Sequence, residues 1–257
     1  MPVVASFHLT RYPARHALGA MAGVVTRRRA LAATPGLRFA RQLGTGSGSA
    51  MALGADLHRW ATFAVWDGDE ALGAFLATSP LARTWAELGE ETWTVRLAPL
   101  SSHGSWGGQQ PFAADPSDSG GGDPDRSGQD GGGGPVAVLT RARVALRHWP
   151  AFYRSVAAVE DHLRRQAGLL AVVGIGEAPL GLQATFSLWR SAAEMTAFAY
   201  RDSPHEEVVR RTRAEGWFTE ELFARFRPYR STGTWDGTDP LAGAGAGRRP
   251  PAGGNGS

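Results

Sequence analysis

One histidine of this sequence lies at the start of a predicted helix, where its ring could act as a ligand. Ser203 can cap the helix, Pro204 suits the first helical position, and Glu206 completes a capping box. His205 therefore falls in the first turn, beside the positive end of the helix dipole, which disfavours the imidazolium form. A neutral imidazole on a rigid helix is what a metal ion or a haem iron needs from a protein. The alternative is a partly buried histidine that only hydrogen bonds with its neighbours.

Large aromatic residues follow His205 just beyond the predicted helix. Gly216 is placed to end the helix, and Trp217 and Phe218 come directly after it. Their rings could form the walls of a site for a flat, apolar cofactor, and core packing explains them about as well. No motif identifies a catalytic group, so Arg213, which lies on the same helix, is only a candidate.

Other residues that could do chemistry have more ordinary explanations. His162 lies in a charged helical stretch and is predicted to be solvated, whereas His8 flanks a strand, where a core or edge histidine is common. Gly44–Gly48 resembles a phosphate loop, but no Gly-Lys-Ser/Thr follows, so a tight turn is the better prediction. Glu220 and Glu221 resemble a solvated turn, and catalysis by paired carboxylates therefore has no specific support.

The composition excludes several classes of protein. All 27 basic residues are arginine and the net charge is +3, but these arginines are scattered, which argues against a nucleic-acid partner. The absence of cysteine excludes disulfides, thiolate-bound haem and iron–sulfur clusters. No apolar segment nears the ~20 residues that span a bilayer, and the first residues lack the pattern of a signal peptide. We expect a soluble cytoplasmic protein, compatible with peripheral contact at the inner face of the membrane.

An internal repeat organises the chain. An Ala-Thr-Phe motif with a tryptophan three residues later occupies residues 61–66 and recurs at 184–189, an offset of 123. A Gly-Ser-Trp turn at 104–108 recurs as Gly-Thr-Trp at 233–237, an offset of 129. The order of the matches is kept and their offsets drift slowly, as small changes in loop length would produce.

The repeat distinguishes His205 from its counterpart in the first copy. The Ser-Pro pair at 79–80 matches the pair at 203–204, so Leu81 occupies the position of His205. Duplicated folds commonly keep one working site and let the other become structural. This asymmetry strengthens the case for His205 as a ligand.

Each copy predicts the order strand–helix–strand–strand–helix–strand, which is the ferredoxin-like arrangement. Two such α+β units can pack face to face as a pseudo-twofold barrel of the dimeric α+β barrel type, which buries both open sheet faces within one chain. The Gly-x-Gly segments at 44–46 and 174–176 are predicted to be turns. The predicted strands are residues 3–9, 37–43, 60–66, 93–97, 136–146, 169–173, 182–189 and 223–226; the predicted helices are 17–33 and 152–167, with further helical segments capped by Asp67 and Ser191.

The composition divides the chain into four parts. Residues 1–112 form the N-terminal repeat and residues 136–240 form the C-terminal repeat, which carries His205. Residues 113–135 are dense in Gly, Asp, Ser and Pro and cannot bury enough apolar surface to become ordered, so we predict a disordered linker. Residues 241–257 have a similar composition and are predicted to be a disordered tail.

Several of these stretches resemble a known family, the spheroidene monooxygenases, which are the acyclic carotenoid 2-ketolases of carotenoid biosynthesis. Motifs of this length, in this order, are specific at the level of a family. The likeness runs from about residue 3 to residue 241, apart from the linker. The matching motifs are Gly44–Gly48, Trp93–Val95, Gly104–Trp106, Val138–Ala142, Gly174–Pro179, Gln183–Trp189, Pro204-His205, Arg213–Phe218, Glu221–Phe226 and Gly233–Gly237.

The resemblance implies a haem-dependent monooxygenase that uses O2 and an external, ferredoxin-type electron donor. Two successive hydroxylations at the C-2 methylene of an acyclic carotenoid would give a gem-diol, which loses water to leave a ketone. The family's Pro-His pair implies that His205 binds the iron of a haem b. The expected substrate is an acyclic carotenoid or another long apolar molecule.

A long polyene needs an apolar channel, which we expect Trp189, Phe198 and Phe226 to line together with Trp217. Two functions of other classes stay open at the level of the sequence. One is a haem-binding or carrier protein without turnover. The other is a cofactor-free monooxygenase of the antibiotic-biosynthesis type with the same fold.

Overall fold

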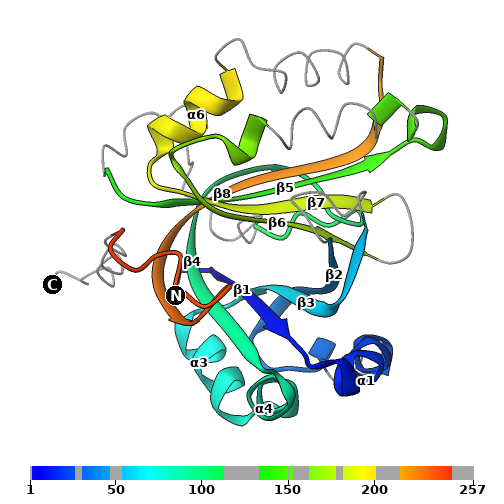
Figure 1. The fold of residues 1–257 in the computed structure, drawn as a ribbon, viewed down its shortest axis with the longest axis vertical. Coiled ribbons are helices and arrows are strands. Elements are labelled where there is room, and N and C mark those ends of the chain that lie inside the picture. The colour runs from blue at the N-terminus through cyan, green and yellow to red at the C-terminus, as the bar shows by residue number, and fades with distance from the viewer. Residues whose placement is uncertain are drawn as a thin grey trace, which may run out of the picture.

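Eight antiparallel strands close into a barrel, which confirms the barrel that the sequence predicted (Figure 1). The computed structural model describes residues 2–26, 31–46, 54–112, 133–149, 151–152, 162–177, 182–200 and 215–244. Around the barrel the order is β1-β3-β2-β6-β7-β5-β8-β4, so each half of the chain contributes four adjacent strands. The strands are β1 (Val4–Arg11), β2 (Leu37–Gly46), β3 (Ala55–Trp66), β4 (Glu91–Gly104), β5 (Val136–Val144), β6 (Leu169–Gly176), β7 (Leu182–Trp189) and β8 (Phe218–Gly233).

The helices of the described residues pack on the outside of the barrel (Figure 1). Helices α1, α3 and α4 lie against the strands of the first half, and α6 lies against those of the second half. A short 3-10 helix follows β5. The bounds of these elements are α1 (Ala14–Thr26), α3 (Asp69–Thr78), α4 (Pro80–Leu88), η3 (Leu146–His148) and α6 (Ala192–Tyr200).

One predicted helix cap is confirmed and another is wrong. The Ser191 hydroxyl accepts a hydrogen bond from the Glu194 N–H at 3.2 Å and donates one to the Glu194 carboxylate, also at 3.2 Å. Asp67 does not cap α3, because the residue at the cap is Gly68. The Asp67 carboxylate instead accepts a hydrogen bond from Arg38 at 2.5 Å. The Asp67 side chain therefore pairs with Arg38 of the neighbouring strand β2 and not with the N-terminus of the helix.

The interior of the barrel is a packed core of apolar side chains. Phe7 and Phe186, one from each half, stack with 3.9 Å between their ring centroids and 8° between their planes. Phe63 stacks on Trp106 at 5.9 Å. Leu241, which we predicted to begin a disordered tail, is 3% exposed within this core. Full burial of each such side chain stabilises the fold by about 1.5–3 kcal/mol.

The Gly-x-Gly segments form strands rather than the predicted turns. Gly44 pairs with Gly176, and Thr45 pairs with Ile175, so these segments join β2 of the first half to β6 of the second. Both Thr45 and Ile175 are fully buried. The prediction failed because it considered local turn chemistry, whereas a pairing partner far along the chain decides the conformation here.

Two glycines are required at the other junction between the halves, where β4 pairs with β8. Gly104 has φ +87°, and a Cβ atom there would lie 2.1 Å from the carbonyl oxygen of Glu221. Gly233 has φ +81°, and its Cβ would lie 1.9 Å from the carbonyl oxygen of Thr92. Only glycine tolerates both the positive φ and this close approach. Each glycine leads into a turn that places a tryptophan in the barrel core.

Candidate functional site

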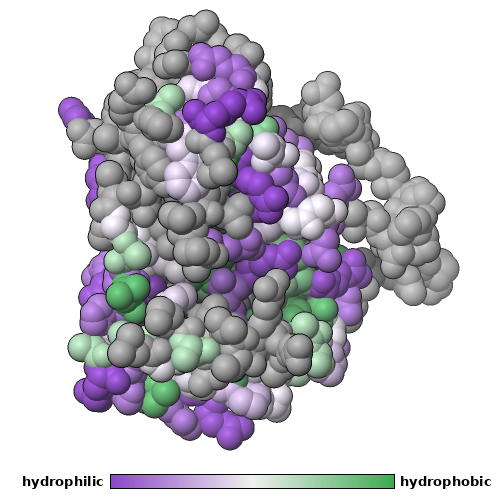
Figure 2. Space-filling view, turned by 90° about the vertical axis from the view of Figure 1, so that its right-hand side faces the viewer, coloured by the Kyte–Doolittle hydropathy of each residue, from purple (hydrophilic) through white to green (hydrophobic). Residues whose placement is uncertain are grey.

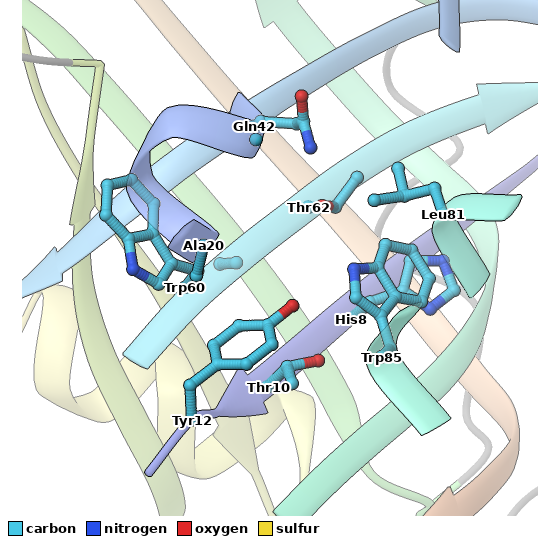
Figure 3. Close-up of a pocket in the computed structure, with 11 residues that line it drawn as sticks. His8, Thr10, Tyr12, Ala20, Gln42, Trp60, Thr62, Leu81 and Trp85 are labelled. Atoms are coloured by element: carbon cyan, nitrogen blue, oxygen red, sulfur yellow. The ribbon is translucent and has the colours of Figure 1, made fainter. Parts of the chain in front are cut away.

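A small pocket lies at Leu81, the first-half counterpart of His205 (Figure 3). It is bounded by α1 and α4 and by the outer face of β1, β2 and β3, with Trp60 and Trp85 as its aromatic walls. The Ser79 hydroxyl accepts a hydrogen bond from the Leu81 N–H at 3.1 Å, so the predicted Ser-Pro cap is confirmed in this copy. The cavity measures about 20 Å³, which is room for about one water molecule.

His8 forms part of the floor of this pocket. Its Nε2 lies 2.8 Å from Ser6 Oγ, and its Nδ1 lies 3.0 Å from Thr94 Oγ1. The ring stacks on Trp85 with 4.6 Å between centroids and is almost fully buried. Burial, and secondarily the positive charge of Arg96, lower the pKa of His8 from 6.5 to about 3. His8 is therefore a neutral core histidine with both nitrogens engaged, and neither nitrogen is free for a metal.

The buried ring of His8 is expected to make stability depend on pH. The unfolded chain takes up a proton on this ring near pH 6.5, whereas the folded protein does so only near pH 3. Between these values the unfolded state binds more protons, so the free energy of unfolding should fall as the pH falls, by up to ~1.4 kcal/mol per pH unit. Urea denaturation at several pH values between about 6.5 and 5, above the range in which carboxylates titrate, measures this slope.

The control for this prediction is His8→Gln. The carboxamide can still hydrogen bond with Ser6 and Thr94 but does not titrate. We expect the variant to lose the slope between about pH 6.5 and 5. A slope equal to that of the wild type would show that another group is responsible.

The strand register identifies the residue of the second half that corresponds to His8. His8 pairs with Thr62 across β1 and β3, and Thr140 pairs with Thr185 across β5 and β7. Thr62 and Thr185 are matched by the sequence repeat. Thr140 therefore stands where the first half has the imidazole of His8.

A second difference lies on the neighbouring strands. Gln42 of β2 also pairs with Thr62, and Gly174 of β6 pairs with Thr185, so a glycine replaces the carboxamide in the second half. Threonine and glycine occupy less volume than histidine and glutamine. The outer face of the second-half sheet therefore carries smaller side chains at the positions that form the pocket floor in the first half.

The principal residues of the predicted cofactor site lie outside the described residues. Residues 201–214, which include both His205 and Arg213, are among those not described. The other two predicted cofactor residues, Trp217 and Phe218, are described and lie at the start of β8. Within the described ranges, no three or more His, Asp or Glu side chains are grouped so that they could hold a metal ion.

Trp217 and Phe218 make aromatic contacts at the end of the barrel near η3. Trp217 is 1% exposed, and its indole N–H donates a hydrogen bond to the Glu215 carboxylate at 2.7 Å. Its ring stacks on His148 with 5.7 Å between centroids. Phe218 meets the ring of Phe152 edge-on at 6.4 Å. These contacts do not test the prediction that the two residues wall a cofactor.

The residues predicted to line a channel do not lie together. Trp189 of β7 and Phe198 of α6 pack against each other on the outside of the barrel, with 5.3 Å between their ring centroids. Phe226 faces the barrel interior, 6.0 Å from Phe63. His162 is half-buried and stacks on Phe198 at 5.6 Å, so the prediction that it is solvated is wrong. The prediction considered only the charged neighbours of His162, whereas its aromatic partner Phe198 is distant in the sequence.

A cluster of charged residues at one end of the barrel was missed by sequence reasoning. Arg141 donates a hydrogen bond from Nη1 to Glu220 at 2.6 Å. Arg41 forms an ion pair with Glu177 at 2.9 Å. The indole of Trp106 donates a hydrogen bond to the same Glu177 oxygen at 2.7 Å. The guanidinium carbons of Arg141 and Arg41 lie 5.4 and 6.0 Å from the Trp106 ring centroid.

The alternation of β5 is the signal that could have identified Arg141. Ala137 and Leu139 point into the barrel core, and Arg141 is the next residue of the same face. Side chains of a strand alternate between its two faces. An arginine at an inward position therefore predicts a buried charge, which needs a partner.

Glu220 is the partner that Arg141 requires, and its prediction as part of a solvated turn is wrong. It lies in β8, where its Oε1 accepts hydrogen bonds from the Ser105 hydroxyl at 3.0 Å and the Gly108 N–H at 2.8 Å. Burial alone would raise the pKa of Glu220, but the hydrogen bonds from Gly108, Arg141 and Ser105 lower it to about 2. The carboxylate is therefore ionised at any physiological pH.

The chain is similar in sequence to curated proteins of one kind, although no family model matches it. It is 35% identical to the spheroidene monooxygenase of Rhodobacter capsulatus over 243 residues, which cover 94% of this chain and 96% of the relative. It is 36% identical to the spheroidene monooxygenase of Rubrivivax gelatinosus over 203 residues, which cover 79% of this chain and 73% of the relative.

The fold is shared with a solved structure of a different enzyme. A crystal structure of aldoxime dehydratase superposes with a TM-score of 0.57 over 88% of this chain and 81% of that one, at 11% sequence identity. At this identity the likeness extends to the fold alone.

Proposed function

Because the chain belongs to the spheroidene monooxygenase family, we propose that it oxidises the C-2 methylene of an acyclic carotenoid to a ketone in a haem-dependent reaction. The observation that carries this proposal is the 35% identity to a curated relative over 94% of the chain. Two hydroxylations would each consume one O2 and two electrons from an external donor, with one oxygen atom of each O2 released as water. The gem-diol then loses water to give the ketone.

The second half is the better place for the haem. In the first half His8 and Gln42 occupy the pocket floor, whereas Thr140 and Gly174 stand at these positions in the second half and take up less space. The smaller residues at these two positions support placing a large planar group on the second-half face. When bound, haem supplies the activation of O2 at its iron.

His205 would hold this haem through a neutral imidazole. Its counterpart Leu81 lines the first-half pocket, which supports a position over the sheet for the side chain that follows the Ser-Pro pair. Trp217 and Phe218 would wall the cofactor, and Arg213 on the same segment is the candidate for a catalytic role.

Two aromatic residues are proposed to receive the carotenoid. Trp189 of β7 and Phe198 of α6 pack against each other on the second-half face, where they would supply apolar side chains of the kind that a polyene needs. Phe226 lies on the opposite face of the sheet, so we propose that it supports the sheet from within.

We also propose that the barrel consists of two tandem ferredoxin-like units. The junction of β4 and β8 supports this proposal, because Trp93 pairs with Gly233 and Gly104 pairs with Leu222. With the repeat offset of 129 residues, Trp93 corresponds to Leu222 and Gly104 corresponds to Gly233. The first pair therefore becomes the second, as expected for a twofold axis between two equivalent units.

The substrate dissolves in lipid, so we propose peripheral contact with the membrane. Within the described residues, no helix is long and apolar enough to cross a bilayer. Figure 2 shows mostly hydrophilic residues on the coloured part of the face in view, with apolar residues in small separate groups. A membrane contact through this part of the surface would therefore be limited in area.

The experiment that tests this function uses the purified chain with haemin, an acyclic carotenoid in detergent micelles, O2, and a ferredoxin with its reductase. We expect a product in which one oxygen replaces two hydrogens, found by mass spectrometry and dependent on all components. Haem binding without any such product would indicate a carrier. Product formation without haem would indicate a cofactor-free monooxygenase.

A further inference from the structure

Arg141 has two hydrogen-bond donors that the fold does not use. The residue is 2% exposed, and its Nη1 is committed to Glu220 at 2.6 Å. Its Nε and Nη2, both buried, have no hydrogen-bond partner among the residues that the structure describes. Each buried donor without a partner costs about 1–3 kcal/mol. Two such donor nitrogens on one side chain indicate a site for a ligand that accepts hydrogen bonds.

The two free donors belong to the same edge of the guanidinium group. The Nε–H and one Nη2–H bond point in parallel along this edge and match the two oxygens of a carboxylate. Glu220 lies at the other nitrogen, so its ion pair leaves this edge open. The geometry therefore suits a planar group with two acceptor oxygens.

The surroundings favour a ligand that only accepts hydrogen bonds. Leu222 and Ala184 flank Arg141 in the barrel register, and the ring of Trp106 lies 5.4 Å from its guanidinium carbon. A water molecule on the free edge would have to donate its own protons to further acceptors. The Glu220 carboxylate already accepts three hydrogen bonds. An oxyanion needs no such acceptors.

A cavity of about 200 Å³ lies at the same end of the barrel, and Leu222, the register partner of Arg141, is one of its lining residues, although Arg141 itself is not. Gly104, Leu222 and Arg141 follow one another across β4, β8 and β5, and both Gly104 and Leu222 line the cavity. Phe112, which packs against the barrel core, lines it as well. This volume is smaller than the pockets of about 300–1,000 Å³ that hold drug-sized molecules. It suits a short organic acid.

The fold itself does not require an arginine at this position. Leu9 pairs with Ala61 in the first half, as Arg141 pairs with Ala184 in the second, and Leu9 is an ordinary member of the core. The second half therefore has the buried charge of Arg141 at the position where the first half has Leu9.

We propose that the free edge of Arg141 binds the carboxylate of a short organic acid in the barrel end lined by Leu222 and Gly104. This site is separate from the proposed haem face, because Arg141 points into the barrel whereas Thr140 belongs to the outer face.

Titration of the full-length protein with sodium acetate and sodium butyrate tests the proposal, with the melting temperature as the readout. Sodium chloride at equal ionic strength and acetamide serve as references. We expect a saturable rise with the two carboxylates and none with acetamide. Arg141→Lys keeps a charge for Glu220 but lacks the two parallel donors, so the apparent affinity should fall at least tenfold.

Two further variants keep the test decisive if Arg141→Lys does not fold. Leu222→Phe, which reduces the cavity and leaves Arg141 in place, should weaken butyrate more than acetate. Arg41→Lys, at the other arginine beside Trp106, should keep the full response. Equal effects of acetamide and acetate, an unchanged response in Arg141→Lys or Leu222→Phe, or no saturable effect of either acid would each overturn the proposal.

Discussion

The variant His205→Ala, titrated with haemin, is expected to show only the broad absorption of free haemin, whereas the wild type is expected to show the sharp Soret band of a histidine-bound haem. With no cysteine in the chain, imidazole is the best axial donor available. The helix cap that the sequence predicts at residues 203–206 would keep the ring of His205 neutral and therefore able to bind iron. A first-turn side chain contributes little to a core, so the variant should remain folded, with a circular dichroism spectrum and melting temperature close to those of the wild type.

The matched control is His162→Ala. His162 also belongs to the second half and stacks on Phe198, so its removal perturbs the proposed substrate face without removing the proposed ligand. We expect full haem content in this variant, and partial recovery of the His205→Ala spectrum when imidazole is added. If His205→Ala binds haem with an unchanged spectrum while His162→Ala loses it, the ligand has been wrongly assigned.

The elements of the fold could be predicted because their signals are local. Alternating apolar residues and flanking turns mark a strand wherever it pairs, and the strand predicted at 182–189 has the bounds of β7. The repeat in the sequence led to the prediction of a barrel, because two equivalent units with one open sheet face each could bury those faces against each other. The structure confirms the closed barrel, whereas the tandem ferredoxin-like units stay a proposal.

The errors have one cause, which is a partner that is distant in the sequence. The sequence predicts a turn at Gly44, but Gly44 pairs with Gly176 in the barrel. The sequence predicts a helix cap at Asp67, but the Asp67 carboxylate binds Arg38. Glu220 reads as solvated because its partner Arg141 lies on another strand. Polar residues have several possible partners, and only the three-dimensional structure selects among them.

The variant Glu220→Ala is expected to destabilise the protein by about 3–5 kcal/mol, because it leaves the buried guanidinium of Arg141 without a counter-charge. It also removes the acceptor for the Ser105 hydroxyl and the Gly108 N–H. Urea denaturation near neutral pH measures the loss. Glu220→Gln retains an acceptor oxygen but no charge, so it should fall between the wild type and Glu220→Ala.

The control is Glu91 of the first half, which binds the turn at 233–237 of the second half, as Glu220 of the second half binds the turn at 104–108 of the first. Its Oε1 accepts hydrogen bonds from the Thr234 hydroxyl at 3.0 Å and the Gly237 N–H at 2.7 Å. Its ion-pair partner Arg11 is 3.8 Å away, has a side chain 36% exposed and also pairs with Asp236. Water and Asp236 can therefore compensate Arg11, and Glu91→Ala should cost only about 1–2 kcal/mol from the lost hydrogen bonds. Equal losses in the two alanine variants would mean that the turns, rather than the buried charge of Arg141, determine the cost.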